Sequence, residues 1–129
     1  MRFRRGTSAR DDPLLRAFGN VASMIDQAQR SLIAAVPTSR DPGVPLREAL
    51  DSFLQQLRAA EAAMPTWHDE RVAHEWTKCS AGIAEARAAA ERLMDLNVEL
   101  TFEQLNAQIG DVLYSLEAFV DAERGLRRR

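Results

Sequence analysis

The sequence is poor in the residues from which disulfides, loops and metal sites are usually built. It contains two histidines and one cysteine among its 129 residues, and glycine and proline together number 11. The single cysteine, Cys79, excludes an intrachain disulfide, which is consistent with a reducing compartment. So few glycines and prolines exclude a loop-rich or disordered chain, and 46% hydrophobic residues are enough to fill one core.

Long hydrophobic runs are also missing. The longest wholly apolar stretch, residues 32–37, is far shorter than the roughly 20 residues that a membrane-spanning helix needs. The basic residues at positions 1–5 are not followed by an apolar run of signal-peptide length. We therefore expect a cytoplasmic protein without a transmembrane segment.

Charge is unevenly distributed along the chain. Residues 1–10 and residues 124–129 each contain four arginines and no acidic residue. The body between them, residues 11–123, has nine basic and 19 acidic residues, a net charge of −10. The sequence therefore combines an acidic body with two arginine-rich ends. These terminal arginines are Arg2, Arg4, Arg5, Arg10, Arg124, Arg127, Arg128 and Arg129.

Apolar residues recur at intervals of three and four over four segments, which is the period of one face of an α-helix. The alternation of period two that marks a half-buried strand is absent. We therefore predict four helices and expect an error of about three residues at their ends. The segments cover residues 13–36, 45–64, 66–96 and 101–126.

Capping residues precede three of these segments. Asp12 is suited to cap the first helix, with Pro13 at its first position. Thr66, with Asp69 three residues later, forms a variant capping box before the third segment, and Thr101 with Gln104 forms a regular one before the fourth. The second segment is expected to end at a proline, residue 65.

Four amphipathic helices of similar length bury their apolar faces when they pack against one another. We predict an all-α fold, an antiparallel four-helix bundle with up-down topology over residues 12–126. Residues 1–11 would form a basic arm and residues 127–129 a basic tail. A helical hairpin that dimerises satisfies the same pattern, but one chain already holds two hairpins. The residues expected to be buried are Phe18, Ile25, Leu50, Phe53, Leu57, Trp76, Ile83, Ile109, Val112 and Leu116.

Further residues can be assigned to a face from the same pattern. We call the apolar residues that recur along one face of a predicted helix its apolar stripe. Phe102 belongs to the stripe of the fourth segment, and Leu113 and Val120 widen that stripe. Cys79 lies on the third stripe, which predicts a buried, unreactive thiol. Large residues that fall off the stripes are expected to be exposed and, if clustered, to mark a contact surface. They are Ile33, Trp67 and Tyr114.

One short pattern occurs twice in the same register. Phe18-Gly19-Asn20-Val21 matches Ile109-Gly110-Asp111-Val112 without gaps, and the match extends to Ile25-Asp26 and Leu116-Glu117. The match is either a relic of a duplicated hairpin or chance similarity between two amphipathic helices. Glycine inside a helix costs about 1 kcal/mol relative to alanine, so Gly19, Gly82 and Gly110 need a structural reason.

Metal chemistry is the first function to consider for a helical bundle. A ferritin-like site needs inward glutamates and Glu-x-x-His pairs, and the sequence has neither, which excludes such a site. Glu70 and His74 are four residues apart and share a helix face, as a surface ion pair or as two metal ligands. The candidate metal ligands are Glu70, His74 and Asp111.

The segment His74-Glu75-Trp76-Thr77-Lys78 resembles the phosphoacceptor helix of histidine phosphotransfer domains, which are also four-helix bundles. In that family an exposed histidine accepts the phosphoryl group, and a lysine one turn later stabilises its charge. The resemblance implies that His74 is a phosphoacceptor and Lys78 its charge partner. The family places the lysine three residues after the histidine and before a glycine, whereas here the gap is four and Cys79 follows.

Residues 108–114, Gln-Ile-Gly-Asp-Val-Leu-Tyr, resemble a metal-binding helix motif of all-α nucleotide pyrophosphohydrolases of the MazG type. That motif is Glu-x-x-Asp, and it binds Mg²⁺ together with an acidic cluster upstream, since magnesium takes oxygen ligands. Asp111 matches the motif, whereas Gln108 replaces its glutamate and the upstream Glu-Glu-x-x-Glu is missing. The resemblance therefore implies a degenerate site.

From these observations we predict a non-catalytic helical bundle that acts through protein–protein contacts or self-association, without a cofactor. The alternative is an enzyme or phosphotransfer domain of one of the two resembled types. Up-down topology would bring the arginine-rich ends together as a docking site for an acidic protein, anionic lipid or nucleic acid. The C-terminal arginines also complement the helix dipole, which needs no partner. The acidic body disfavours sequence-specific DNA binding.

Overall fold

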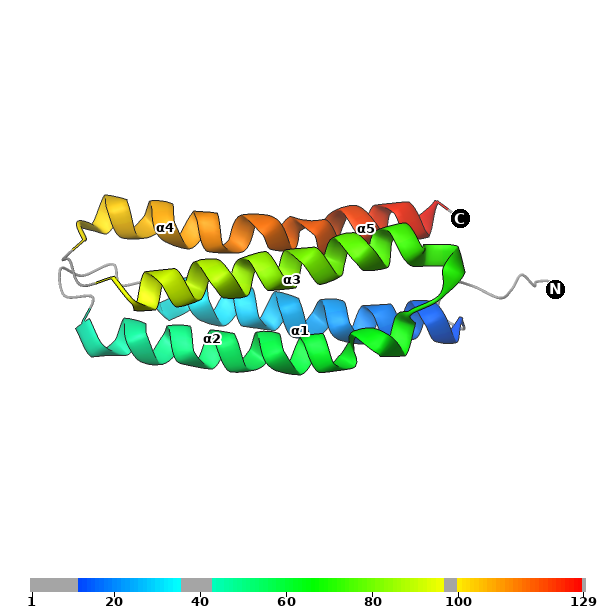
Figure 1. Ribbon diagram of the computed structural model, residues 1–129, viewed down its shortest axis with the longest axis horizontal. Coiled ribbons are helices and arrows are strands. Elements are labelled where there is room, and N and C mark those ends of the chain that lie inside the picture. The colour runs from blue at the N-terminus through cyan, green and yellow to red at the C-terminus, as the bar shows by residue number, and fades with distance from the viewer. Residues whose placement is uncertain (1–11, 36–42, 97–99, 129) are drawn as a thin grey trace.

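Four long helical segments follow one another along the chain and lie side by side (Figure 1). The computed structural model describes residues 12–35, 43–96 and 100–128, and the structural statements below concern these residues. Within them the protein is an all-α four-helix bundle without strands, as predicted. The elements are α1 (Pro13–Ala35), α2 (Gly43–Ala63), η2 (Met64–Trp67), η3 (Glu70–Val72), α3 (Ala73–Met94), α4 (Phe102–Tyr114), η4 (Ser115–Glu117) and α5 (Ala118–Arg127).

The direction of each segment can be followed in Figure 1. The chain crosses the molecule along α1, returns along α2, crosses again along α3 and returns along α4 and α5. Neighbouring segments in the sequence therefore run in opposite directions, and α5 ends at the end of the bundle where α1 begins. The arm over residues 1–11 and Arg129 lie outside the described residues.

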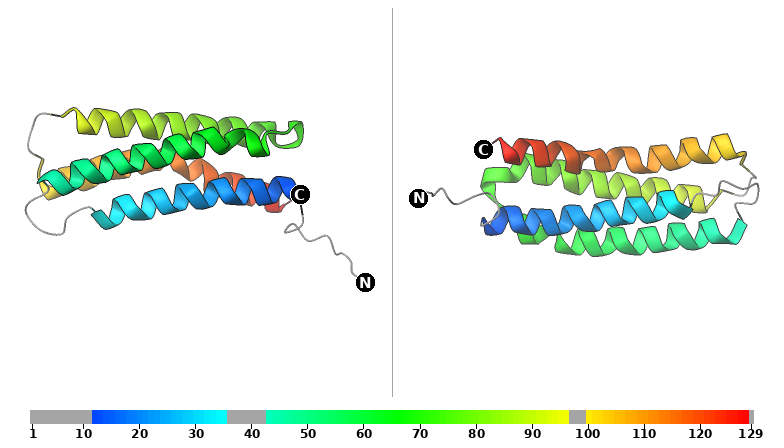
Figure 2. Two further views of the ribbon diagram at one scale, coloured as in Figure 1. Left: turned by 90° about the horizontal axis from the view of Figure 1, so that it is seen from below. Right: turned by 180° about the vertical axis from the view of Figure 1, so that it is seen from behind.

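The helices do not pack equally on all sides of the bundle. Close contacts join α1 to α2, α2 to α3, and α3 to α4, η4 and α5. The fourth side, between α1 and the α4–α5 segment, faces the viewer in the right panel of Figure 2 with α3 behind it. In the described part of the chain, the Cα atoms of this pair come within 8 Å at fewer positions than those of the other neighbouring pairs, and the pair packs through large side chains, with the rings of Phe18 and Phe119 stacked at 6.2 Å between centroids.

The stripe positions account for nearly all of the observed core. Of the ten residues predicted to be buried, every one except Trp76 is at most 4% exposed. Cys79 is buried, Leu113 is half-buried, and Ile33 and Tyr114 are exposed, all as expected. No helix in residues 12–35, 43–96 and 100–128 is long and apolar enough to cross a membrane.

The prediction that the third helix begins at Thr66 is wrong. Residues 64–72 form two short 3-10 turns, and α3 begins at Ala73. Pro65 has no backbone N–H to continue the helix before it. The Thr66 hydroxyl donates to the carbonyl of Ala63 at 2.6 Å, so it does not cap a new helix. Asp69 caps the 3-10 turn η3, because its carboxylate accepts the backbone N–H of Arg71 at 2.8 Å, and no side-chain hydrogen bond caps the start of α3 at Val72.

The irregular connection over residues 64–72 reverses the predicted burial of the two tryptophans, Trp67 and Trp76. Trp67 was predicted to be exposed, but it is 0% exposed, and its ring meets Phe18 edge-on at 4.8 Å between centroids. The 3-10 turn after Pro65 changes the direction of the side chain, so a position off the α-helical stripe points inward. Trp76, predicted to be buried, is half-buried, and its indole N–H donates to the carbonyl of Met64 at 2.8 Å.

The last long segment contains a 3-10 turn, η4, where it crosses α3 at Gly82. A Cβ atom at Gly82 would clash with the backbone carbonyl oxygen of Ser115, so glycine is what permits the close approach. The Ser115 hydroxyl donates to the carbonyl of Gly82 at 3.1 Å, and the Cys79 thiol donates to the carbonyl of Ala118 at 3.6 Å. These contacts fix α3 against α4 and α5.

The same turn explains why Val120 is not part of the core. Each residue of a 3-10 helix turns the chain by about 120°, whereas each residue of an α-helix turns it by about 100°. Three 3-10 residues therefore rotate the helix that follows by about 60° relative to an unbroken α-helix. The stripe position expected from an unbroken α-helix therefore moves outward, and Val120 is 49% exposed. Phe102, also predicted to lie on the stripe, is 47% exposed because it is the first residue of α4, at the end of the bundle.

Candidate functional site

The proposed phosphoacceptor His74 lies in the first turn of α3. His74 and Lys78 are both exposed, as the resemblance to phosphotransfer domains requires of its histidine. Glu70 lies in η3, before the irregular junction with α3. Among the described residues, no ion pair within 4 Å joins Glu70 to His74, so the sequence-based expectation of a surface pair is not met.

The third candidate metal ligand, Asp111, lies on the exposed surface of α4. Across residues 12–35, 43–96 and 100–128, no three His, Cys, Asp or Glu side chains converge in a way that could hold a metal ion. Asp111 therefore does not join Glu70 and His74 in one cluster.

Cys79 is the described side chain with the largest shift of its pKa. Burial, followed by the carboxylates of Glu75 and Asp121, raises the pKa of Cys79 from 9.0 to about 12. The thiolate is the nucleophilic form of cysteine, so raising the pKa makes this thiol unreactive near neutral pH. Its role in the described structure is packing and the contact with Ala118.

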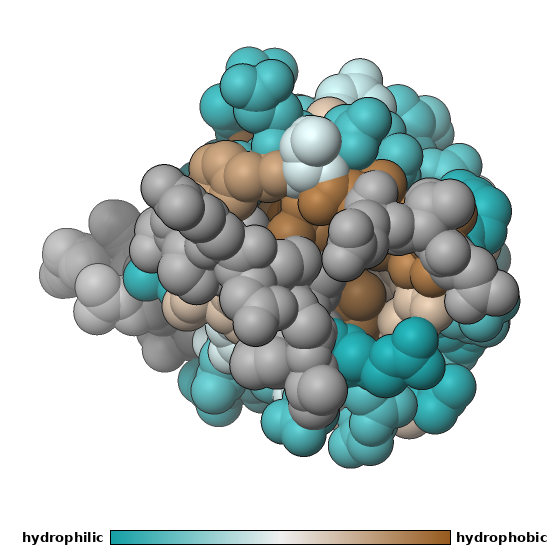
Figure 3. Space-filling model, turned by 90° about the vertical axis from the view of Figure 1, so that its left-hand side faces the viewer, coloured by the Kyte–Doolittle hydropathy of each residue, from teal (hydrophilic) through white to brown (hydrophobic). Residues whose placement is uncertain are grey.

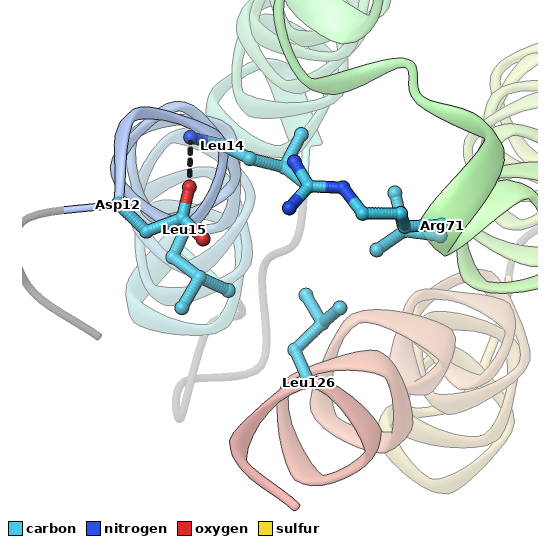
Figure 4. Close-up of a pocket in the computed structure, with 6 residues that line it drawn as sticks. Asp12, Leu14, Leu15, Arg71 and Leu126 are labelled. Carbon is cyan, nitrogen blue, oxygen red and sulfur yellow. Dashed lines mark hydrogen bonds between the residues drawn. The ribbon is translucent and has the colours of Figure 1, made fainter. Parts of the chain in front are cut away.

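The two described ends of the chain meet at one end of the bundle. Asp12 and Leu126 line the same cavity of about 330 Å³, together with Leu14, Leu15 and Arg71 (Figure 4). The Asp12 carboxylate accepts the backbone N–H of Leu14 at 2.9 Å and so caps α1. Arg71 extends toward Leu14 from the far wall, and Leu126 points into the space from α5.

Charges of both signs lie around this cavity. Arg71 forms an ion pair with Asp69 at 3.1 Å. The backbone and side-chain hydrogen bonds of Arg71 lower the pKa of Asp69, and the same side-chain bond raises the pKa of Arg71. Both directions keep the pair charged, so it contributes no net charge to this end of the bundle.

Only three of the eight arginines of the predicted docking site lie within the residues that the structure describes. Arg124, Arg127 and Arg128 are exposed at the end of α5, and Arg127 forms an ion pair with Glu123 at 3.2 Å. The start of α1 lies at the same end of the bundle. A site for an acidic partner stays a prediction here. The arginines that lie outside the described residues are Arg2, Arg4, Arg5, Arg10 and Arg129.

Partly exposed apolar residues, which the sequence did not reveal as a group, lie on the side of the bundle between α1 and the α4–α5 segment. Contacts of Gly82 and Cys79 place Ser115 and Ala118 toward α3. The opposite flank of the same segment therefore turns toward α1. Helical periodicity places Phe102, Asn106 and Leu113 on it, and Val120 follows on the outer side of this flank after the rotation at η4.

The facing flank of α1 is identified in the same way. Leu15 lines the cavity with Leu126 of α5, so its flank turns toward the α4–α5 segment. Ala22, Asp26 and Ile33 follow Leu15 on this flank at helical spacing, so a charged residue separates the apolar ones. We call the two facing rows the apolar seam: Leu15, Ala22 and Ile33 on α1, and Phe102, Leu113 and Val120 on α4–α5.

The apolar seam holds most of the exposed large hydrophobic residues in the described chain. Ile33, Phe102 and Val120 are 57%, 47% and 49% exposed, and Leu96 and Tyr114 complete the set. Ile33, Leu96 and Phe102 lie at or near helix ends on one end of the bundle, and Figure 3 shows hydrophobic residues at the surface there. The sequence signal for this surface was the width of the apolar stripe on the fourth segment.

Comparison with known proteins adds no assignment to this geometry. Neither protein-family models, nor curated protein sequences, nor solved structures give a significant match to the chain.

Proposed function

We propose that this chain is a non-catalytic helical bundle that acts through protein–protein contacts made by the apolar seam. The observation that carries the proposal is that three of the exposed large hydrophobic residues in the described chain, Ile33, Phe102 and Val120, lie on one side of the bundle. Ile33 and Phe102 lie at the same end of that side, where exposed apolar residues gathered together mark an interaction site. Their burial by a partner would be favourable in proportion to the apolar area removed from water.

The spacing between α1 and the α4–α5 segment bears on the same proposal. The two segments pack through large side chains such as Phe18 and Phe119, whose rings stack at 6.2 Å between centroids, and few of their Cα atoms come within 8 Å. Ile33 and Val120 are 57% and 49% exposed beside this contact, so their exposed parts are available to a protein partner.

Site-specific photo-crosslinking in the cells that produce the chain tests the proposal. A photoreactive amino acid replaces Val120 in one variant and Tyr114 in a matched control. Tyr114 is 73% exposed on the same segment but lies off the apolar seam. We expect a discrete protein adduct from position 120 and not from position 114. Equal or absent adducts at the two positions would refute the proposed contact surface.

A further inference from the structure

We infer that the cavity between α1, η3 and α5 binds a small uncharged molecule that has an aliphatic body of about six carbon atoms and one hydroxyl group. This inference goes beyond the proposed function and does not depend on it. The cavity lies at the end of the bundle where α1 begins, whereas Ile33 and Phe102 of the apolar seam lie at the other end.

The size of the cavity fits a small molecule. Residues of α1, η3 and α5 line it, together with Asp12 just before α1 (Figure 4). Three separate elements therefore enclose a space that one helix face could not provide. Its volume is about 330 Å³, and sites for small molecules have volumes of about 300–1,000 Å³. The cavity lies at the lower end of that range, which favours a short ligand.

The lining of the cavity favours an aliphatic body. Four of its six lining residues have branched aliphatic side chains: Leu14, Leu15, Val72 and Leu126. Val72 and Leu126 are 2% and 5% exposed, so the cavity reaches the edge of the core, and the two leucines of α1 are half-buried. None of these four side chains donates or accepts a hydrogen bond. An alkyl chain placed among them gains free energy in proportion to the apolar area removed from water.

The other two lining residues, Asp12 and Arg71, carry opposite charges. Asp69 makes the largest contribution to the raised pKa of Arg71, and the Asp12 carboxylate raises it further. The charges of Asp12 and Arg71 therefore act on each other. An anionic ligand would be attracted by Arg71 and repelled by Asp12, and a cationic ligand would meet the reverse. Neither sign of charge is favoured at this site.

A hydroxyl group suits this pair of residues because it is both a donor and an acceptor. One oxygen of the Asp12 carboxylate accepts the N–H of Leu14 at 2.9 Å, and a carboxylate has two oxygens, each with more than one acceptor position. A ligand hydroxyl would donate to Asp12 and accept from the guanidinium of Arg71. A charged head group would also have to lose its hydration shell, which costs more than for a hydroxyl.

Calorimetric titration of the purified chain with 1-hexanol provides the first test. We expect saturable binding of one molecule per chain with a dissociation constant of about 0.1–1 mM, the affinity of an efficient ligand of this size. Hexanoate and hexylamine have the same chain length and a charged head group. Both should bind at least ~10-fold more weakly than 1-hexanol, because each is repelled by one of the two charged residues.

The second test locates the ligand by nuclear magnetic resonance. Bound 1-hexanol should shift the methyl resonances of Leu14, Leu15, Val72 and Leu126. Ile33 serves as the internal control, since it is 57% exposed and lies at the opposite end of the bundle. Its methyl resonances should not change with the same saturation curve. A shift at Ile33 equal to those in the cavity would show general adsorption to apolar surface.

Two substitutions test the roles of the lining residues. Leu126→Phe places a larger side chain in the cavity and should weaken binding of 1-hexanol at least ~10-fold, whereas Val120→Phe at an exposed position of the same helix should not. Arg71→Met keeps an unbranched apolar side chain and removes the guanidinium. It should weaken binding of 1-hexanol by up to ~10-fold and make hexylamine the preferred ligand, because Asp12 then stands alone. Arg128→Met, exposed at the same end of the bundle, should leave both constants within ~3-fold.

Several outcomes would overturn this inference. They are the absence of saturable binding up to about 10 mM 1-hexanol, unchanged affinity in Leu126→Phe, and hexanoate or hexylamine binding as tightly as the alcohol. If Leu126→Phe proves unfolded by circular dichroism, the reversal expected of Arg71→Met still decides. None of these outcomes alters the adduct expected at position 120, so this inference and the proposed function fail separately.

Discussion

The contact between Gly82 and Ser115 makes a strong prediction about stability. Gly82 is buried in the middle of α3, and an alanine there would direct its Cβ atom at the carbonyl oxygen of Ser115. The obstructing atom belongs to the backbone of η4, so it cannot move aside as the end of a flexible side chain would. Gly82→Ala must therefore push α3 and the α4–α5 segment apart.

The size of the effect follows from opposing contributions. Replacing glycine by alanine inside a helix is favourable by about 1 kcal/mol. Overpacking a close contact costs about 1–3 kcal/mol, and weakening the hydrogen bond from the Ser115 hydroxyl to the Gly82 carbonyl costs about 1 kcal/mol more. We expect a net loss of about 1–3 kcal/mol in the free energy of unfolding. For a domain of this size the melting temperature should fall by about 4–12 °C.

Urea unfolding followed by circular dichroism measures this loss, with Gly19→Ala as the matched control. Space is open at Gly19, so the same substitution should raise the stability by up to about 1 kcal/mol when the chain is monomeric. The two variants should therefore change stability in opposite directions. A Gly82→Ala variant that is as stable as the unaltered chain would show that the close approach of α3 to Ser115 is not present in solution.

Three further predictions concern the core, the buried thiol and a helix cap. Leu57→Ala should cost about 2–5 kcal/mol in urea unfolding because Leu57 is 0% exposed, and an unchanged midpoint would mean that the second stripe is misassigned. Cys79 has a folded pKa of about 12 against a reference of 9.0, so the stability it contributes is complete below pH 9 and is lost as pH rises toward 12. The stability difference between the unaltered chain and Cys79→Ala should follow that change, and a difference that is constant with pH would contradict the burial of the thiol. Thr101→Ala removes the hydroxyl that accepts the Gln104 N–H and should cost about 1 kcal/mol, whereas Thr77→Ala on an exposed turn of α3 should cost less.

The fold was predictable to the extent that it depends on local periodicity. Spacings of three and four identified four helices, and the bounds of α1 and α2 agree with the expected ones to within two residues. The capping box at Thr101 and Gln104 was also read correctly, because both of its hydrogen bonds form between residues close in sequence. Such features are local and do not require knowledge of what packs against the helix.

The apolar seam could not be predicted in the same way. Ile33, Phe102 and Val120 were each assigned to a face of their own helix, but no pattern within one helix tells which neighbouring helix covers that face. Val120 was placed in the core because an unbroken α-helix was assumed, and the 3-10 turn at residues 115–117 rotates it outward. The seam becomes visible when the contacts between helices are known.

What the sequence determined by itself was the number of helices, most of their core positions and the caps at Asp12 and Thr101, since hydrophobic period and capping act within a few residues. Tertiary structure alone decided the burial of Trp67, the exposure of Val120 and the stacking of Phe18 of α1 on Phe119 of α5. These features depend on two short 3-10 segments and on the approach of α3 to Ser115 at Gly82. Each of them couples residues far apart in the chain, so its free energy depends on packing that a one-dimensional pattern does not contain.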